Sequence, residues 1–231
     1  MTLLADPVEG EWPPERTTFG AGGAEPYAAA LRNADNVLYL RRAFSSEHAT
    51  IDAARWSADA DDTDLRLLDG VTGSVLDIGC GPGRMVRAAM GRGLIALGID
   101  VSATAVRMAA DGGLSVFQGS VFDPLPREGA WSAALLVDGN IGIGGDASAL
   151  LERCVELLAP DGILLVELSH DAARDDSYLG MIEDSAGGRS AVFPWAEIGI
   201  DALRDRAGAA GLVVAQDWRG NDRWFARLLR A

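Results

Sequence analysis

Residues 75–84 read Val75-Leu76-Asp77-Ile78-Gly79-Cys80-Gly81-Pro82-Gly83-Arg84, and this segment sets the architecture of the chain. A short apolar run ends in an acidic residue and is followed by three alternating glycines and a helix-compatible segment, which indicates a buried strand, a tight turn and a helix start. Glycine lets a turn adopt backbone angles closed to other residues and lets a ligand approach without meeting a Cβ. The free N–H groups of the helix start face whatever sits over the turn. The segment therefore predicts a ligand-binding shelf at the carboxyl end of a parallel strand.

Strands and helices alternate downstream of this turn. Short apolar runs predict the strands, and the longer segments between them predict the helices. We expect strands at 74–78, 94–99, 114–118, 131–137 and 163–168, with helices at 84–91, 103–110 and 147–158. Strands separated by helix-length segments imply right-handed crossovers, so the pattern predicts a parallel sheet covered by helices on both faces.

The C-terminal part departs from this alternation. Residues 169–195 form an insertion rich in Asp, Gly and Ser, and a helix is predicted at 196–210. The strands expected at 212–218 and 223–229 are joined by the turn Arg219-Gly220-Asn221-Asp222, which is too short for a crossover helix. These two strands are therefore predicted to pair antiparallel as a hairpin.

The N-terminal part carries no recognisable motif. Prolines and glycines indicate an irregular arm over residues 1–24. Pro26 can open a helix that runs to about Phe44, because proline suits the first helical turn. Acidic residues at 61–64 can cap a short helix over 65–69.

The composition restricts the partners of the protein. The chain has 231 residues and a formal net charge of −14, and its pI is near 4.5. A field of that sign repels phosphate backbones and anionic membranes, so we expect neither nucleic acid nor a membrane as a partner. All 20 basic residues are arginine. Schiff-base chemistry and lysine-dependent phosphate loops are therefore excluded.

Cysteine usage and the N-terminal residues indicate a reduced, cytoplasmic protein. Cys80 and Cys154 lie in the glycine turn and in an apolar helix, without metal-ligand spacing. Residues 1–6 lack the basic start and the long apolar core of a signal peptide, and no apolar run is long enough to span a bilayer. We therefore expect no metal site and a cytoplasmic location.

The Asp-x-Gly-x-Gly-x-Gly turn after the first strand, Asp100 after the second strand and the closing hairpin together resemble the class I S-adenosylmethionine-dependent methyltransferases. The chain looks like the small single-domain bacterial members. The resemblance covers residues 61–231, and residues 1–60 look like the variable N-terminal cap of that family, here expected to be an arm and a helical cap. It implies an α/β fold, a Rossmann-like three-layer sandwich with a seven-stranded, mostly parallel sheet and an antiparallel C-terminal hairpin.

The resemblance also implies roles for individual residues. Asp77 would orient the methionine amino group of S-adenosylmethionine, and Asp100 would accept hydrogen bonds from both ribose hydroxyls. Ser120 stands where the family often has Asp, and its hydroxyl can accept from the adenine amino group. Asn140 matches the segment beside the sulfonium and is a candidate catalytic residue. The cofactor-binding residues implied are Asp77, Gly79, Cys80, Gly81, Gly83, Asp100, Val101, Ser120, Val121, Asp138, Gly139 and Asn140.

Further candidates lie after the fifth predicted strand and in the N-terminal cap. His170 follows that strand directly, at the ligand-binding edge of the sheet, and is the candidate general base; a surface histidine in an Asp-rich loop is the alternative. Phe193 and Trp195 either form a wall of the acceptor pocket or plug the core. Tyr27 and Tyr39 either cover an apolar acceptor or simply pack a cap helix.

We therefore expect a methyltransferase that transfers a methyl group from S-adenosylmethionine to a small-molecule acceptor by in-line displacement, largely through positioning. One alternative is a non-catalytic module that binds S-adenosylmethionine or a nucleotide, since the same aspartates would serve it. Another is an NAD-dependent oxidoreductase. Against the latter, dinucleotide binders require Gly-x-Gly-x-x-Gly, whereas the glycines here alternate and position 84 is Arg. The sequence carries no signal for the identity of the acceptor or for an oligomeric state.

Overall fold

The computed structural model describes Phe19 and residues 25–32, 37–43, 45 and 47–231. This part of the chain contains a large sheet of seven strands and a small sheet of four. The large sheet consists of β3 (Ser74–Ile78), β4 (Ile95–Asp100), β5 (Val116–Gln118), β6 (Trp131–Leu136), β7 (Leu158–Leu168), β10 (Leu212–Gly220) and β11 (Arg223–Arg230). The small sheet consists of β1 (Leu38–Arg42), β2 (His48–Ile51), β8 (Asp175–Asp184) and β9 (Phe193–Ile198).

The large sheet has the strand order β10-β11-β7-β6-β3-β4-β5, and its strands from β7 to β5 run parallel. Every residue of β3 is buried, as expected of a strand covered on both faces. The helices that connect or flank these strands are α3 (Asp62–Leu67), α4 (Arg84–Gly91), α5 (Ala103–Asp111), α6 (Ala147–Leu157) and α7 (Ile200–Ala209). The predicted parallel sheet is confirmed, and α4 has the predicted bounds.

The predicted C-terminal hairpin is also confirmed. Strands β10 and β11 pair antiparallel, and β11 pairs antiparallel with β7, so that Trp224 lies opposite Leu168. Asn221 and Asp222 in the connecting turn have φ angles of 47° and 56°, the sign that tight hairpin turns require. The hairpin brings Arg223 to the carboxyl end of β7.

Two apolar cores separate the large sheet from its helices. One core contains Trp131 from the sheet together with residues of α6 and α7, and the other contains Phe225 together with residues of α3 and α4. Helix α3 begins at Asp62 rather than at residue 65. Asp61 explains the difference, because its carboxylate accepts from the N–H of Asp64 (2.8 Å) and the two residues form a capping box.

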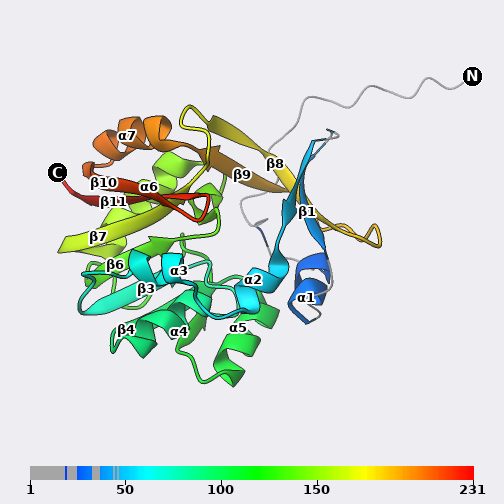
Figure 1. The fold of residues 1–231 in the computed structure, drawn as a ribbon, viewed down its shortest axis with the longest axis horizontal. Coiled ribbons are helices and arrows are strands. Elements are labelled where there is room, and N and C mark those ends of the chain that lie inside the picture. The colour runs from blue at the N-terminus through cyan, green and yellow to red at the C-terminus, as the bar shows by residue number, and fades with distance from the viewer. Residues whose placement is uncertain (1–18, 20–24, 33–36, 44, 46) are drawn as a thin grey trace, which may run out of the picture.

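The small sheet forms one unit with α1 (Glu25–Arg32) and α2 (Ala53–Ser57), and we call this unit the cap. It stands beside the large sheet (Figure 1). The predicted helix from Pro26 to about Phe44 is wrong at residues 38–42, which form β1. Leu38 is buried, and β1 pairs with β2 along one edge and with β8 along the other, so tertiary pairing overrides the helical pattern. The predicted end at Phe44 lies outside the described residues, as does the irregular arm apart from Phe19.

The segment predicted as an irregular insertion, residues 169–195, instead supplies β8 and the first half of β9. It joins the N-terminal strands directly, with Leu38 opposite Asp184. Strand β9 also takes the first residues of the helix predicted at 196–210, so α7 begins only at Ile200. The cap is thus built from two segments that lie far apart in the sequence. None of the helices in the described part has the length and apolar character needed to cross a lipid bilayer.

Candidate functional site

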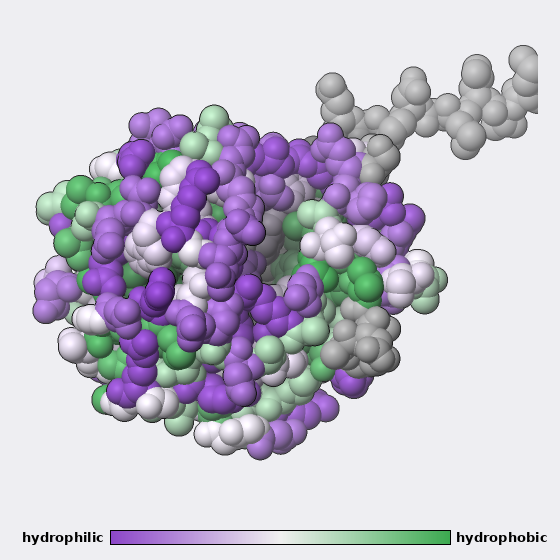
Figure 2. Space-filling view, in the orientation of Figure 1, coloured by the Kyte–Doolittle hydropathy of each residue, from purple (hydrophilic) through white to green (hydrophobic). Residues whose placement is uncertain are grey.

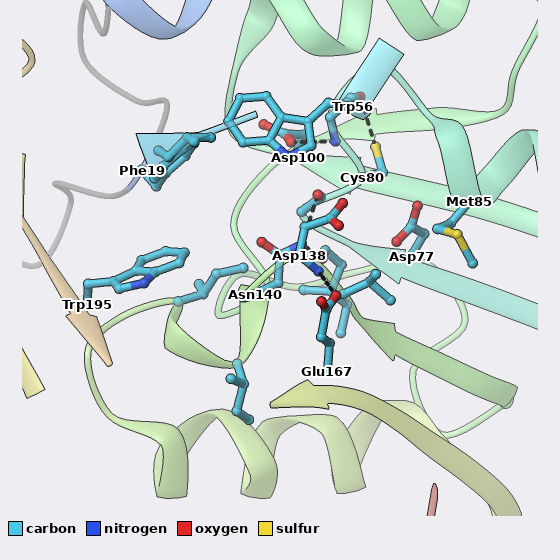
Figure 3. A pocket seen from close by; sticks show the side chains of 18 of the residues that line it. Phe19, Trp56, Asp77, Cys80, Met85, Asp100, Asp138, Asn140, Glu167 and Trp195 are labelled. Atoms are coloured by element: carbon cyan, nitrogen blue, oxygen red, sulfur yellow. Dashed lines mark hydrogen bonds between the residues drawn. The ribbon is translucent and has the colours of Figure 1, made fainter. Parts of the chain in front are cut away.

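A cavity of about 600 Å³ lies between the carboxyl ends of the parallel strands and the cap. Its lining comes from the loops after β3 to β7, from α2 and β9, and from Phe19. The molecular surface is hollowed between the two parts of the protein (Figure 2). Figure 3 shows Phe19 and Trp195 on one side of this cavity, Asp77, Asp138 and Glu167 on the other, and Trp56 beside Asp100. Parallel strands end at a common edge, which brings together side chains distant in sequence.

The glycine turn after β3 borders the cavity. The N–H groups of Gly79 and Cys80 both donate to the carbonyl of Ile99 (2.9 Å each), which ties the turn to β4. Gly79 and Gly81 have φ angles of +72° and +54°, a region that favours glycine. A Cβ on Gly79 would lie 2.7 Å from Nδ2 of Asn140. The turn therefore packs too closely against the loop after β6 to accept a larger residue without rearrangement.

Asp100 ends β4 and lies beside this turn. Its two carboxylate oxygens accept hydrogen bonds from the N–H groups of Gly81 (2.9 Å) and Ser102 (2.8 Å). The residue is 8% exposed and lines the cavity. Burial raises the pKa of Asp100 to about 6, and the backbone donors limit the rise. A carboxylate held in this way has lone pairs left for two neighbouring hydroxyls, so it fits the ribose expected here.

Asp77 lies near the end of β3, is 3% exposed and also lines the cavity. Burial raises its pKa to about 8, and the charges of Asp138 and Asp100 contribute to that rise. A cation that binds beside a buried carboxyl group stabilises its ionised form. The amino group expected here is such a cation, so the residue fits its predicted role.

Five charged side chains form a network on the side of the cavity towards the large sheet, and we call them the charged floor: Asp64, Arg84, Asp138, Glu167 and Arg223. Arg84 donates to Asp64 and to Asp138 (2.5 Å). Arg223 donates to Asp64 (2.6 Å) and to both oxygens of Glu167 (2.7 and 2.6 Å). Asp64, Arg84 and Arg223 are 1%, 3% and 6% exposed. Buried charges are tolerated where each has several partners of opposite sign.

The charged floor also fixes the conformation of the loop after β6. The N–H of Asp138 donates to Glu167 (2.7 Å), and its carboxylate accepts from Arg84 and from Arg223 (3.3 Å). Asp138 has a φ angle of 56°, which is unfavourable for a residue other than glycine. These contacts hold it in that conformation. Its carboxylate borders the cavity but is engaged by arginines.

Asn140 opens the short 3-10 turn η1 (Asn140–Gly142). Its Nδ2 donates to the carbonyls of Ile78 (2.8 Å) and Gly79 (3.0 Å). The side chain therefore ties the loop after β6 to the glycine turn. This bond pair explains why Asn140 sits at the cavity, and its direct contact with cofactor or acceptor stays a prediction.

Four aromatic side chains line the cap side of the cavity, and we call them the aromatic wall: Phe19, Tyr27, Trp56 and Trp195. The ring of Phe19 lies at the centre, with centroids 5.2 Å from Tyr27, 6.0 Å from Trp56 and 5.5 Å from Trp195. Figure 3 shows Phe19 and Trp195 across from Asp77, Asp138 and Glu167. Ring pairs at these separations attract one another beyond the burial of their surface.

The structure separates the four aromatic residues predicted at the acceptor. Tyr27 and Trp195 line the cavity, whereas Phe193 and Tyr39 do not. Phe193 is fully buried and packs against Trp195 (5.9 Å), so it belongs to the core of the cap. The ring of Tyr39 packs against His48 (5.4 Å). Phe193 thus packs inside the cap, and Tyr39 packs between the strands β1 and β2 rather than on a cap helix.

Most of the other predicted residues reach the cavity. Val101, Ser120, Val121 and Gly139 are on its lining, and the exposed His170 lines it after β7. Gly83 is an exception, because it is the N-cap of α4, with a φ angle of +90°, and a Cβ there would lie 2.3 Å from Leu114.

Two of the residues predicted to bind the cofactor, Ser120 and Cys80, have side chains that are constrained by their local surroundings. The hydroxyl of Ser120 accepts from the N–H of Phe122 (3.2 Å). Cys80 is buried, and burial raises the pKa of its thiol well above the ordinary range, so the thiolate needed for nucleophilic chemistry is disfavoured.

Sequence reasoning missed Phe19 and the arginines of this region. Arg55 of α2 lines the cavity and donates to Asp61 and Asp64 (3.2 Å each), which links the cap to the charged floor. Arg223 and Asp64 are 159 positions apart in the chain. The only feature of the local sequence that pointed to this pair was the position of Arg223 at the start of an apolar hairpin strand. Among the described residues, no group of three or more His, Cys, Asp or Glu is arranged to hold a metal ion.

The chain is similar to a known family and to several solved structures. Residues 75–162 match the family described as "Methyltransferase domain". A solved S-adenosylmethionine-dependent methyltransferase from Bacteroides fragilis, in complex with S-adenosyl-L-homocysteine, has 21% identity and a TM-score of 0.75. The similarity covers 93% of this chain and 98% of that one.

Two further solved structures are similar over less of the chain. The 1,6-didemethyltoxoflavin-N1-methyltransferase of Burkholderia thailandensis, with bound 1,6-didemethyltoxoflavin and S-adenosylhomocysteine, has 17% identity and a TM-score of 0.58, covering 77% of this chain and 81% of that one. The S-adenosylmethionine-bound amino pentose methyltransferase CalS10 of Micromonospora echinaspora has 16% identity and a TM-score of 0.55, covering 78% and 95%. At these identities the likenesses establish the fold, and they confirm the Rossmann-like prediction. No curated protein matches the chain significantly.

Proposed function

We propose that the chain is a class I S-adenosylmethionine-dependent methyltransferase that methylates a small-molecule acceptor with S-adenosylmethionine as the donor. One observation carries the proposal. The buried carboxylate of Asp100, held by the N–H of Gly81 in the glycine turn, faces the same cavity as the aromatic wall. The carboxylate suits a ribose and the wall suits an organic acceptor, so one cavity offers room for both reactants.

In this proposal, one half of the cavity holds the cofactor. Asp100 accepts hydrogen bonds from the ribose hydroxyls, and Asp77 accepts from the amino group. Gly83 acts indirectly, by shaping the start of α4. The other proposed contacts are Gly79, Cys80, Gly81, Val101, Ser120, Val121, Asp138, Gly139 and Asn140.

When bound, S-adenosylmethionine supplies an electrophilic methyl group for in-line displacement. The protein contributes position and exclusion of water. The charged floor and Asn140 fix the glycine turn and the loop after β6 relative to each other. Trp195 and Tyr27 cover the acceptor. His170, on the lining and open to solvent, accepts a proton from the acceptor and passes it to water.

A non-catalytic binding module needs only the cofactor half of the cavity. The aromatic wall favours an enzyme, because Phe19 and Trp195 offer apolar lining beyond the proposed cofactor contacts, whereas Tyr27 lies next to Gly81 of the glycine turn. The family match and the neighbouring structures give no support to an NAD-dependent oxidoreductase.

A thermal-shift and calorimetric comparison of S-adenosylhomocysteine with NADH tests the cofactor half. We expect S-adenosylhomocysteine to bind and stabilise the protein, since binding to the folded state alone raises stability. Stabilisation by NADH alone would contradict the proposal. A screen of acceptor metabolites for S-adenosylhomocysteine release tests turnover, and binding without release for every acceptor would favour the non-catalytic module.

The role of His170 has a separate test. In the variant His170→Ala we expect the pH–rate profile to lose the ionisation that belongs to the general base. An unaltered profile would remove His170 from the mechanism and leave the rest of the proposal intact. His48→Ala is the matched control, because His48 does not line the cavity.

A further inference from the structure

The charges on the cavity lining are strongly unbalanced. Six carboxyl residues line it, against three arginines, and five of the six remain charged near pH 7 because burial raises the pKa of Asp77 to about 8. The six are Asp52, Asp77, Asp100, Asp138, Glu167 and Glu197. An excess of negative charge in a partly enclosed site repels an anion more strongly than the same charges would in open water.

Each of the three lining arginines is already paired with carboxylates, and the guanidinium atoms without a hydrogen-bond partner, Nε of Arg55 and Nε of Arg84, are buried. Arg84 is paired with Asp64 and Asp138, and Arg223 with Asp64 and Glu167. Arg55 is paired with Asp61 and Asp64. Recruiting any of them for a carboxylate or phosphate on the acceptor would break a buried or half-buried pair, which is costly.

The carboxylate of Glu197, which belongs to the cap, also has hydrogen-bond partners. Glu197 lies on β9, next but one after Trp195, and accepts from the hydroxyl of Tyr178 (2.6 Å) and from Arg174 (2.7 Å). These bonds hold the carboxylate in place and pair its charge with Arg174. The acceptor side is therefore negative or neutral in character.

The shape of the acceptor side comes from flat rings. Phe19 and Trp195 approach each other at an interplanar angle of 38°, and Tyr27 and Trp56 meet edge to face at 68°. Leu40, Ile51 and Ile143 extend the apolar lining around these rings. A planar aromatic molecule can stack or make edge contacts on such a wall, whereas a saturated molecule of equal size can only bury area.

We infer that the acceptor is a planar aromatic molecule that carries no negative charge. This inference rests on the proposed function, since it concerns the acceptor half of the same cavity. It combines the aromatic wall, which selects flat rings, with an excess of carboxylates whose neighbouring arginines are all paired.

Three probes that share one carbon skeleton test the inference: 2-naphthol, which is neutral near pH 7, the anion 2-naphthoate, and the saturated alcohol 2-decalol. Each is titrated by calorimetry into protein saturated with S-adenosylhomocysteine, so that no reaction occurs. We expect 2-naphthol to bind about tenfold more tightly than either of the others. Equal or tighter binding of 2-naphthoate or 2-decalol, or no binding of 2-naphthol, would overturn the inference.

Two variants of the aromatic wall and one control test whether the wall causes the preference for 2-naphthol. Trp195→Leu and Trp56→Leu should each weaken 2-naphthol binding about fivefold, with S-adenosylhomocysteine affinity changed less than about twofold. Trp218→Leu is the control, because Trp218 stacks on Phe225 (5.7 Å) in the hairpin and does not line the cavity. If it weakened 2-naphthol binding as much as the wall variants do, the wall would not be the acceptor site.

The design separates this inference from the function on which it rests. Failure of S-adenosylhomocysteine to bind the wild-type protein would contradict the proposed function itself. Normal S-adenosylhomocysteine binding with no preference among the three probes would contradict only the acceptor class. Retained S-adenosylhomocysteine affinity also shows that each variant is folded.

Discussion

The charged floor and the aromatic wall face each other across one cavity, and different forces hold them in place. In the floor, Asp64 and Arg84 pair at almost complete burial, and Arg223 bridges Asp64 to Glu167. Removing one member leaves an uncompensated charge in a low-dielectric site. The floor therefore tolerates little change in geometry.

The wall depends on contacts without strict direction. Its four rings come from the isolated described residue Phe19 and from α1, α2 and β9, and they touch at centroid distances of 5.2–6.0 Å. Aromatic packing tolerates volume-conserving changes better than buried ion pairs tolerate the loss of a partner. The two sides therefore differ in tolerance: the floor requires fixed geometry, whereas the wall accepts changes in its rings.

The largest expected effect breaks the floor. Arg223→Met leaves Asp64 and Glu167 without one of their cations, and we expect the free energy of unfolding to fall by about 3–5 kcal/mol. Urea unfolding at pH 7 measures it. Arg219→Met is the matched control in the same hairpin, because exposed Arg219 only stacks on Trp224 at 4.0 Å, and its loss should cost less than about 1 kcal/mol. Equal losses in both variants would mean that the floor is no more demanding than the surface.

The next largest expected effect is on ligand binding at Asp100, beside the glycine turn. Asp100→Asn keeps the shape of the side chain but removes its charge, and we expect S-adenosylhomocysteine binding to weaken by about 2 kcal/mol, the scale of hydrogen bonds to a charged group. Titration calorimetry measures the change. Asp146→Asn serves as control, since Asp146 caps α6 outside this cavity. An unchanged affinity for the Asp100 variant would remove that residue from the site.

A pH titration sharpens the electrostatic side of the comparison. The folded-state pKa of Asp77 is about 8, above its ordinary value of 3.8. The folded protein therefore keeps this proton until about pH 8, and the contribution of Asp77 to stability falls as pH rises between these two values. A cationic amino group needs the ionised form, so S-adenosylhomocysteine affinity should rise about tenfold between pH 6.5 and pH 8.5.

The control for this titration is Asp77→Asn, which carries no charge at any pH. Calorimetry in buffers of different ionisation enthalpy should detect proton release on binding by the wild-type protein and much less by the variant. A flat affinity profile in the wild-type protein would mean that Asp77 does not meet the amino group.

The smallest expected effect lies in the wall. Trp56 is half-buried, and Trp56→Phe keeps an aromatic ring in contact with Phe19. We expect the free energy of unfolding to change by less than about 1 kcal/mol. The same urea experiment compares it with Arg223→Met. A loss as large as that of the floor variant would abolish the distinction between the two sides of the cavity.

The cap shows where sequence reasoning failed. Residues 38–42 carried enough apolar positions to fit a helix, yet they form β1 because β2 and β8 hydrogen-bond to both of its edges. The Asp-rich segment after β7 looked irregular, yet Asp175–Asp184 form β8 between β1 and β9. Neither outcome was visible locally, because each strand depends on partners supplied by the other segment.

Most of the residues predicted to bind the cofactor line the cavity, and the reason is again physical. Asp77, Asp100 and the alternating glycines follow parallel strands directly, and the carboxyl ends of such strands meet at one edge. Phe193 was harder, because an aromatic residue next to a pocket can face either way, and it packs behind Trp195. The floor partners Asp64, Glu167 and Arg223 were missed, since charge pairing across more than fifty positions leaves no local pattern.

The sequence by itself therefore determined the large sheet, its closing hairpin and the glycine turn with its aspartates. Each of these depends on short-range spacing: strand and helix periods, a turn too short for a crossover, and glycines that allow positive φ. Only the tertiary structure decided that the cap is a sheet, that Arg223 reaches Asp64 and that Phe19 meets Trp195. Those contacts arise from burying apolar surface and pairing buried charges between distant segments, and no stretch of the chain contains both partners.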